Sequence, residues 1–244
     1  MKKLSIISVI LIIAGILVAA SPLIGQWYTN YQENKLINEW LDNEDSAATG
    51  STEASNPEEA YAGLQDIFAS EGTDNTDTAE VQPSDSPAAA ATEKPAPAPK
   101  PGKPASPQIV LGIIRIDKID VKAPIVEGVE ASNLKVGIGH IPGTAALGQA
   151  GNSALAGHRS YTFGKFFNRL DELVVGDEIR ITTKKEDLVY KVYEKLVVTP
   201  DDVSVLKGDK DKNIITLITC TPIYVASHRL IIHASLVERV LKQP

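Results

Sequence analysis

The chain contains a single cysteine, Cys220, and this residue is the first candidate for chemistry. It ends an apolar run over residues 214–220, which Thr221 and Pro222 terminate, and strand ends beside loops commonly display functional groups. A lone thiol serves as a nucleophile, forms an intermolecular disulfide or packs as a small buried hydrophobe. One cysteine excludes both a disulfide framework within the chain and a multi-cysteine metal site.

A thiol nucleophile requires a nearby base, because the thiolate attacks and the leaving group must later be protonated. The chain holds four histidines, which are His140, His158, His228 and His233. His158 ends a second apolar run, and Gly157 before it allows a close turn of the backbone. His140 lies in a loop, and His233 alternates with isoleucine in a late strand. Spacing alone does not choose among them.

An oxyanion formed by thiolate attack requires hydrogen-bond donors, which are backbone N–H groups and often a cation. Arg229 lies nine residues after Cys220, across a loop, and begins the last predicted strand. A strand–loop–strand arrangement would bring this guanidinium beside the thiol. On spacing alone, an arginine that is simply exposed to solvent is the favoured interpretation.

Runs rich in valine and isoleucine predict short strands throughout the C-terminal part of the chain. They cover residues 109–116, 122–126, 152–156, 178–183, 188–198, 214–220 and 229–237. Two short helices are also expected, one over residues 162–173 and one beginning at Thr199-Pro200. Many short strands with few helices predict a mostly β fold, either a closed barrel or a sandwich.

The N-terminal part has a different composition. Residues 4–20 carry no charge and follow Lys2 and Lys3, and about 20 apolar residues suffice to cross a bilayer as a helix. We expect residues 1–25 to form a cytoplasmic tip and an uncleaved membrane anchor, with a cleaved signal peptide as the alternative. The positive-inside rule then places the N-terminus in the cytoplasm and the strand-rich domain outside the cell.

Residues 26–41 predict a juxtamembrane helix, and residues 42–107 an acidic, disordered linker. The linker holds 13 acidic residues, three basic ones and nine of the 15 prolines, so it accounts for the net charge of −7. Such a segment cannot bury enough apolar surface to offset its ordering entropy. Within it, only residues 61–68 have the spacing of a short amphipathic helix. The acidic total also argues against nucleic-acid binding.

The motifs of the strand-rich part resemble those of the sortase family, the cysteine transpeptidases of Gram-positive cell surfaces. The likeness is carried by NSALAGHR (152–159), TLITCTP (216–222) and RLIIH (229–233), in the family order of His, Cys and Arg. The loop over residues 137–144 also looks like the sortase segment upstream of the catalytic histidine. The resemblance covers about residues 108–240, within an expected catalytic domain over residues 108–244.

This resemblance implies an eight-stranded β-barrel with short helices, in which Cys220 is the nucleophile and His158 its acid/base partner. Arg229 would stabilise the oxyanion or position the substrate, and Thr219 stands where sortases often carry a substrate-contacting hydroxyl. No cofactor is implied. Some sortases bind calcium through acidic loops, but the scattered carboxylates here are interpreted as a solvated surface (Glu127, Glu130, Asp171, Glu172, Asp177, Asp201 and Asp202).

The resemblance also implies a reaction and its partners. A membrane-anchored sortase would cleave an LPXTG-like sorting signal of a surface protein between Thr and Gly, form a cysteine thioester and pass the acyl group to a peptidoglycan-precursor amine. The alternatives are a hydrolytic cysteine peptidase with the same triad and a non-enzymatic, membrane-tethered binding domain. Residues 162–173 look most like class D, with classes E and A as rivals, and no lid motif of the pilin-polymerising sortases precedes the barrel.

Overall fold

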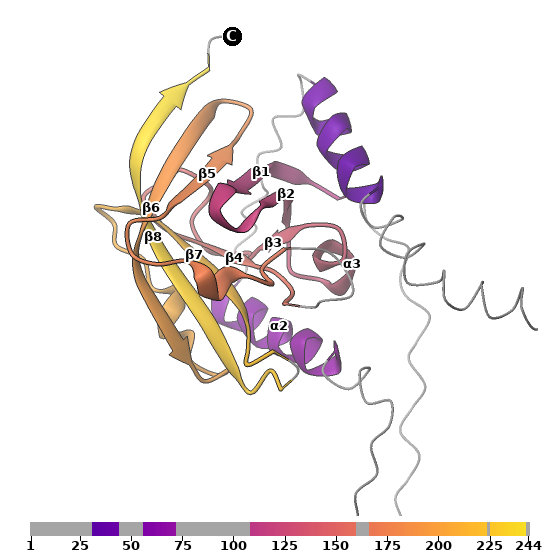
Figure 1. Cartoon of the computed structure of the whole chain (residues 1–244), viewed down its shortest axis with the longest axis vertical. Helices are drawn as coiled ribbons and strands as arrows, with labels where there is room; N and C mark the ends of the chain where they lie inside the picture. Colours follow the sequence, from indigo (N-terminus) through magenta and orange to yellow (C-terminus); the bar gives the residue numbers. More distant parts are fainter. Residues whose placement is uncertain (1–30, 44–55, 72–107, 160–165, 224, 243–244) are drawn as a thin grey trace, which may run out of the picture.

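The computed structural model describes residues 31–43, 56–71, 108–159, 166–223 and 225–242 (Figure 1). The expected membrane anchor lies outside these residues, and none of the helices within them is long and apolar enough to cross a bilayer. The described part is built around a closed β-barrel with the strand order β1-β2-β3-β4-β7-β8-β6-β5. This confirms the expected mostly β, eight-stranded barrel.

The strands are β1 (Val110–Ile116), β2 (Val121–Glu127), β3 (Ile138–His140), β4 (Gly151–Ala156), β5 (Glu178–Thr182), β6 (Glu186–Val198), β7 (Asn213–Thr221) and β8 (His228–Leu241). Two neighbouring pairs are parallel, β2 with β3 and β4 with β7, and the remaining pairs are antiparallel. Seven strands match the predicted runs to within a few residues. The eighth, β3, lies in a segment read as a loop, because three residues are too few to show a strand period.

Two clusters of buried apolar side chains explain why β7 carries apolar residues on both of its faces. Leu217 and its inward-facing neighbours fill the barrel interior. Ile218 and other outward-facing residues belong to a second cluster, which α2 (Pro57–Glu71) covers from outside. A strand that is buried on both faces does not need to alternate apolar and polar residues. The presence of apolar residues on the outer face of β7 before Cys220 therefore reflects the covering helix.

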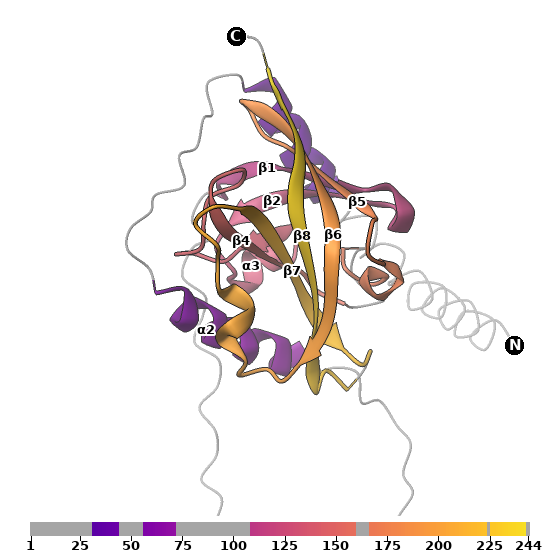
Figure 2. The ribbon, with the colours of Figure 1, turned by 90° about the vertical axis from the view of Figure 1, so that its left-hand side faces the viewer.

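The helix α2 corrects the expectation of a disordered linker over residues 42–107. Its side chains Tyr61, Leu64 and Phe68 are 1, 0 and 2% exposed and pack against the barrel wall. Both ribbon views place α2 across the barrel beneath the end of β7 and the start of β8 (Figure 2). Residues 57–71 are therefore part of the folded unit, and residues 61–68, which have the spacing of an amphipathic helix, lie within this longer helix.

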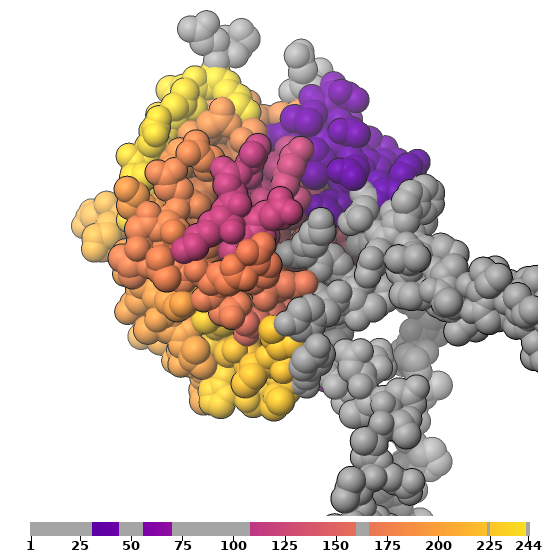
Figure 3. Space-filling model, viewed as in Figure 1, coloured from indigo at the N-terminus to yellow at the C-terminus, as the bar shows by residue number. Residues whose placement is uncertain are grey.

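A second helix, over residues 31–42, agrees with most of the expected helix over residues 26–41, whose first five residues lie outside the described part. Ile37 and Trp40 pack against Val110, Ile113 and Val126 of the first two strands. In the space-filling view this indigo helix lies directly against the magenta start of the barrel (Figure 3).

The remaining helical pieces are short, and they correct two predictions. They are η1 (Asp117–Ile119), α3 (Ala131–Leu134), η2 (Leu170–Glu172) and η3 (Val203–Leu206). Of the helix predicted over residues 162–173, residues 166–173 form only the turn η2. Their apolar side chains point into the barrel core instead of lining one face of a helix. No helix begins at Thr199-Pro200. Instead, Asp202 caps η3 by accepting a hydrogen bond from the backbone N–H of Ser204 at 3.0 Å.

Candidate active site

Three neighbouring strands, β4, β7 and β8, bring the candidate residues to one edge of the barrel. In the antiparallel pair β7–β8, Cys220 lies directly opposite Arg229. In the parallel pair β4–β7 the last registered partners are Ala156 and Ile218, and His158 and Cys220 each follow two positions later. Because residues two apart share a face of a sheet, this register places His158, Cys220 and Arg229 side by side.

The shared face is the outer surface of the barrel. Ile218 and Ile231, which flank Cys220 and Arg229 on that face, belong to the cluster covered by α2. Leu217 and Leu230 alternate with them and point into the barrel interior. The candidate site therefore lies between the barrel wall and α2.

Arg229 is almost completely buried, at 3% exposed. Its Nε donates to the side-chain oxygen of Gln65 on α2 at 2.5 Å. Its Nη1 donates to the carbonyl oxygens of Ala226 at 2.7 Å and His228 at 2.9 Å. These contacts exclude the interpretation of Arg229 as a solvent-exposed arginine and fix the guanidinium at the site.

His158 and Arg229 share one aromatic neighbour, Phe68 of α2. The His158 and Phe68 rings meet edge to face with centroids 5.6 Å apart, and the guanidinium carbon of Arg229 lies 5.3 Å from the Phe68 centroid. A guanidinium over a ring face is attracted by the ring quadrupole. Phe68 therefore connects the acid/base candidate and the cation candidate from the α2 side.

The buried Tyr61 adds to the low-polarity surroundings of the site. Burial raises the pKa of its phenol from 10.0 to about 12, and the nearby positive charge of Arg229 opposes that rise only partly. The Tyr61 hydroxyl has no hydrogen-bond partner among the described residues. Charges interact more strongly in such a site, because it is shielded from water.

Thr219, for which a substrate contact is predicted, is buried in this structure. It is 0% exposed, and its hydroxyl donates to the carbonyl oxygen of Gly157 at 2.7 Å. The backbone N–H of Gly157 in turn donates to the carbonyl oxygen of Ile218 at 3.1 Å. Thr219 faces the opposite side of the strand from Cys220, where it ties the segment before His158 to β7. A Cβ at position 157 would come within 2.8 Å of the Ile138 and Phe167 side chains, so this close approach requires glycine.

The other three histidines occupy different environments. His140 Nδ1 lies 3.0 Å from the Glu127 carboxylate and its Nε2 lies 3.0 Å from the carbonyl oxygen of Ala145, which ties β3 to the following loop. His233 is bonded to the Thr216 hydroxyl at 2.8 Å. His228 is registered opposite Thr221, so it faces away from the side that Arg229 and Cys220 share. Of the four, His158 is the one that the strand register places next to Cys220 on the face that Cys220 and Arg229 share.

The acidic residues that were interpreted as a solvated surface do not converge. Within the described ranges, no group of three or more His, Cys, Asp or Glu side chains is placed to hold a metal ion. Glu172 pairs with Arg169 at 2.7 Å, and Asp177 pairs with Lys118 at 2.7 Å. These carboxylates therefore have partners of opposite charge on the protein surface.

The sequence reasoning missed the residues that surround the three candidates. Gln65 and Phe68 reach the site from α2, which lies in the segment predicted to be a disordered linker. The sequence feature that indicates this helix is the apolar spacing of residues 61, 64 and 68. Arg159 stands in the sequence simply as the residue after His158, yet its Nη1 reaches the carbonyl oxygen of Cys220 at 3.2 Å. The spacing of charged residues gives no local sign of such a contact.

Comparison with known proteins agrees with this geometry. A family model described as a sortase domain matches residues 114–237. Among curated relatives, Sortase D of Bacillus subtilis is 33% identical over 46% of this chain and 54% of its own length. Sortase SrtE1 of Streptomyces coelicolor is 36% identical over 52% of this chain and 40% of its own. The chain thus spans about half the length of the curated relatives it matches.

Solved structures of sortases share the barrel. A lid mutant of sortase A from Corynebacterium diphtheriae is 37% identical with a TM-score of 0.52, and the match covers 55% of this chain and 73% of that one. Sortase C-1 from Actinomyces oris is 33% identical with a TM-score of 0.51, covering 53% and 74%. With a family model that spans the barrel and the three motif residues at one edge of it, the chain belongs to the sortase family.

Proposed function

We propose that the chain is a cysteine transpeptidase that cleaves a sorting signal and transfers the acyl group to a cell-wall amine. The observation that carries the proposal is the register of β4, β7 and β8, which sets His158, Cys220 and Arg229 side by side on one face. A nucleophile, an acid/base group and a cation are the groups that acyl transfer through a thioester requires.

The first half of the reaction is acylation. The Cys220 thiolate attacks the carbonyl carbon of Thr in the Thr–Gly bond of an LPXTG-like signal, and the carbonyl π electrons move to oxygen. Backbone N–H groups and the Arg229 guanidinium stabilise this oxyanion. When the oxyanion collapses, the C–N bond breaks, and His158 gives its proton to the departing amine. The product is a thioester between the substrate carbonyl and Cys220.

The second half is transfer. An amine from a peptidoglycan precursor attacks the thioester carbonyl, and neutral His158 accepts a proton from that amine. The C–S bond then breaks and the Cys220 thiolate is restored, with a new amide bond in the product. Water in place of the amine would give hydrolysis, so the acceptor decides between transpeptidase and peptidase.

The contact between Arg229 and α2 constrains the first step. Arg229 is 3% exposed and its Nε is held by Gln65. A substrate oxyanion can therefore accept from Nε only when Gln65 releases it. The peptide would accordingly enter along the face of the barrel that α2 covers.

The cellular setting is part of the proposal. The uncharged run over residues 4–20 behind Lys2 and Lys3 supports a single-pass anchor with the N-terminus in the cytoplasm and the barrel outside the cell. The relative named Sortase D supports assignment to class D, and the relatives named Sortase A and SrtE1 keep classes A and E as the alternatives.

The test is a ligation assay on the purified chain, with a labelled LPXTG peptide and an amine acceptor. We expect a ligated product that increases with acceptor concentration and that the Cys220→Ala variant does not form. A hydrolysed product that is insensitive to acceptor would favour the peptidase. No product at all, together with a Cys220 that does not react with thiol reagents near neutral pH, would favour a binding domain.

A further inference from the structure

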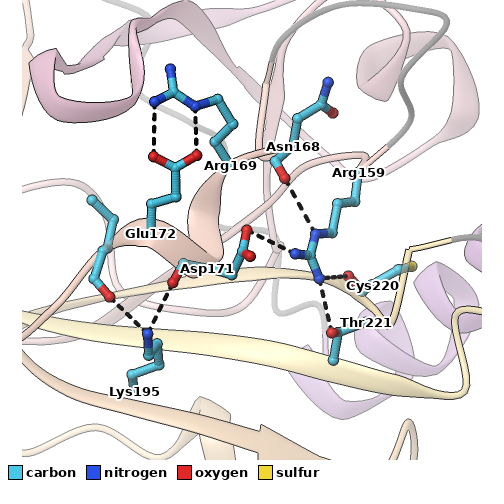
Figure 4. A network of polar contacts seen from close by, with 9 residues as sticks. Arg159, Asn168, Arg169, Asp171, Glu172, Lys195, Cys220 and Thr221 are labelled. Carbon is cyan, nitrogen blue, oxygen red and sulfur yellow. Dashed lines mark hydrogen bonds and ion pairs between the residues drawn. The ribbon is translucent and has the colours of Figure 1, made fainter.

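The residue that follows His158 is a buried arginine with four contacts. The Arg159 side chain is 6% exposed, and its Nη2 pairs with the Asp171 carboxylate at 2.8 Å. Its Nη1 donates to the Thr221 hydroxyl at 2.8 Å and to the carbonyl oxygen of Cys220 at 3.2 Å. Its Nε donates to the carbonyl oxygen of Asn168 at 3.4 Å (Figure 4). One guanidinium thus joins three separate segments of the chain.

These contacts complete a pair of ties between the end of β4 and the end of β7. Before His158, the Gly157 carbonyl oxygen accepts from the Thr219 hydroxyl at 2.7 Å. After His158, Arg159 holds the carbonyl oxygen of Cys220. The residue on each side of the acid/base candidate is therefore fixed to the strand that carries the nucleophile.

The far end of the guanidinium is anchored as well. Asp171 lies in the turn η2, and its backbone carbonyl oxygen accepts from the Lys195 ammonium of β6 at 3.0 Å. The same ammonium bonds the carbonyl oxygen of Leu173 at 3.0 Å. The turn that presents the Asp171 carboxylate to Arg159 is thus held to the barrel, and Arg159 is fixed from both sides.

The atom of Cys220 to which Arg159 donates is the main-chain carbonyl oxygen. In Figure 4 the Cys220 sulfur lies at the opposite end of the residue from the carbonyl oxygen that Arg159 bonds. Thr221, its other partner on β7, alternates with Cys220 and so faces the opposite side of the strand. Arg159 is therefore placed to act on the chemistry through the position of the main chain.

We propose that Arg159 is a positioning residue that sets the Cys220 main chain relative to His158. The inference rests on the proposed function. A buried arginine suits the role because its planar fork offers several donors in fixed directions, whereas lysine is a point charge on one nitrogen. A lysine at position 159 could not bond Asp171, Asn168 and the end of β7 together. Displacement of about 1 Å at a reacting group can cost roughly 10²-fold in rate.

The test compares Arg159→Lys with Arg169→Lys. Arg169 is a matched control, because it lies beside the same turn and pairs with Glu172 but is 51% exposed in its side chain. We expect Arg159→Lys to lower kcat about 10- to 100-fold with KM changed less than about twofold. Arg169→Lys should leave both within about twofold, since exposed ion pairs contribute little. Equal kcat for Arg159→Lys and wild type would overturn the proposal.

A second pair of variants keeps the test decisive if Arg159→Lys folds poorly. Asp171→Asn weakens the same anchor from an exposed carboxylate, and Glu172→Gln is its neighbour in the same turn. We expect Asp171→Asn to lower kcat several-fold at an unchanged thermal midpoint and Glu172→Gln to have no effect. If kcat falls in both pairs only in proportion to the amount of folded protein, Arg159 has a structural role and not a positioning role.

Alkylation of Cys220 without peptide separates this proposal from the proposed function. A thiol beside an imidazole reacts near neutral pH because the neighbour stabilises the thiolate. Misplacing the two groups should slow the reaction with iodoacetamide several-fold in Arg159→Lys and leave it unchanged in Arg169→Lys. If wild type forms no ligated product but this difference appears, the proposed function fails and the positioning role stands. If the alkylation rates are equal, the positioning role fails.

Discussion

Replacing Phe68 by alanine should release α2 from the barrel. Phe68 is 2% exposed and belongs to the cluster between α2 and β7–β8. Removing a buried phenylalanine side chain costs about 3–5 kcal/mol. A tenfold change in an equilibrium corresponds to about 1.4 kcal/mol, so the ratio of docked to undocked α2 should fall roughly 10²- to 10⁴-fold.

Hydrogen exchange measured by mass spectrometry reads this ratio directly in the peptide covering residues 57–71. Its amides should exchange faster by the same factor, until they reach the rate of an unfolded peptide. Asp66→Ala is the matched control, because Asp66 lies on the exposed side of the same helix. Cys220 is half-buried against the same cluster, so its reaction with a bulky maleimide should also accelerate in Phe68→Ala. Unchanged exchange in Phe68→Ala, or equal acceleration in Asp66→Ala, would refute the docking of α2 through Phe68.

Three further predictions concern single groups. Arg229→Lys should lower kcat about 10²- to 10³-fold in the ligation assay, because an ammonium does not reproduce the guanidinium donors. Burial raises the pKa of Tyr61 and of Tyr190 to about 12, so the unfolded chain loses these protons first as pH rises. The free energy of unfolding that these two phenols contribute is therefore complete below about pH 10 and is lost between about pH 10 and 12. Urea midpoints at several alkaline pH values measure this loss, which Tyr61→Phe should reduce. Burial lowers the pKa of His233 below 6.5, so the unfolded chain binds the proton first on acidification. Stability should therefore fall as pH drops below about 6.5, and the same midpoints in His233→Gln should fall less.

The candidate site could be predicted largely because its groups lie at strand ends that pair with each other. A strand–loop–strand arrangement could bring Arg229 beside Cys220, although spacing alone favours a solvent-exposed arginine, and the two are partners in the β7–β8 register. His158 could not be chosen from spacing, because its neighbour in space, Cys220, is far along the chain. Only the parallel pairing of β4 with β7 brings them together.

The surroundings of the site could not be predicted for physical reasons that differ by residue. The apolar residues of α2 are few among many acids and prolines, so the composition of the linker concealed a helix that gains its stability from packing on the barrel. Phe166 and Leu173 have helical spacing, yet each enters the barrel core from irregular chain. Arg159 is charged, and its burial depends on partners as distant as Thr221.

In the proposed reaction Cys220 carries the acyl group, and the intact mass of the acyl-enzyme tests this role most directly. The chain is mixed with an LPXTG peptide without an amine acceptor, quenched in acid and weighed. We predict an added mass equal to the peptide segment up to Thr, located on the fragment that contains Cys220, removed by hydroxylamine and absent from Cys220→Ala. Turnover of the peptide by Cys220→Ala, or an adduct on another residue, would contradict the assignment of the nucleophile.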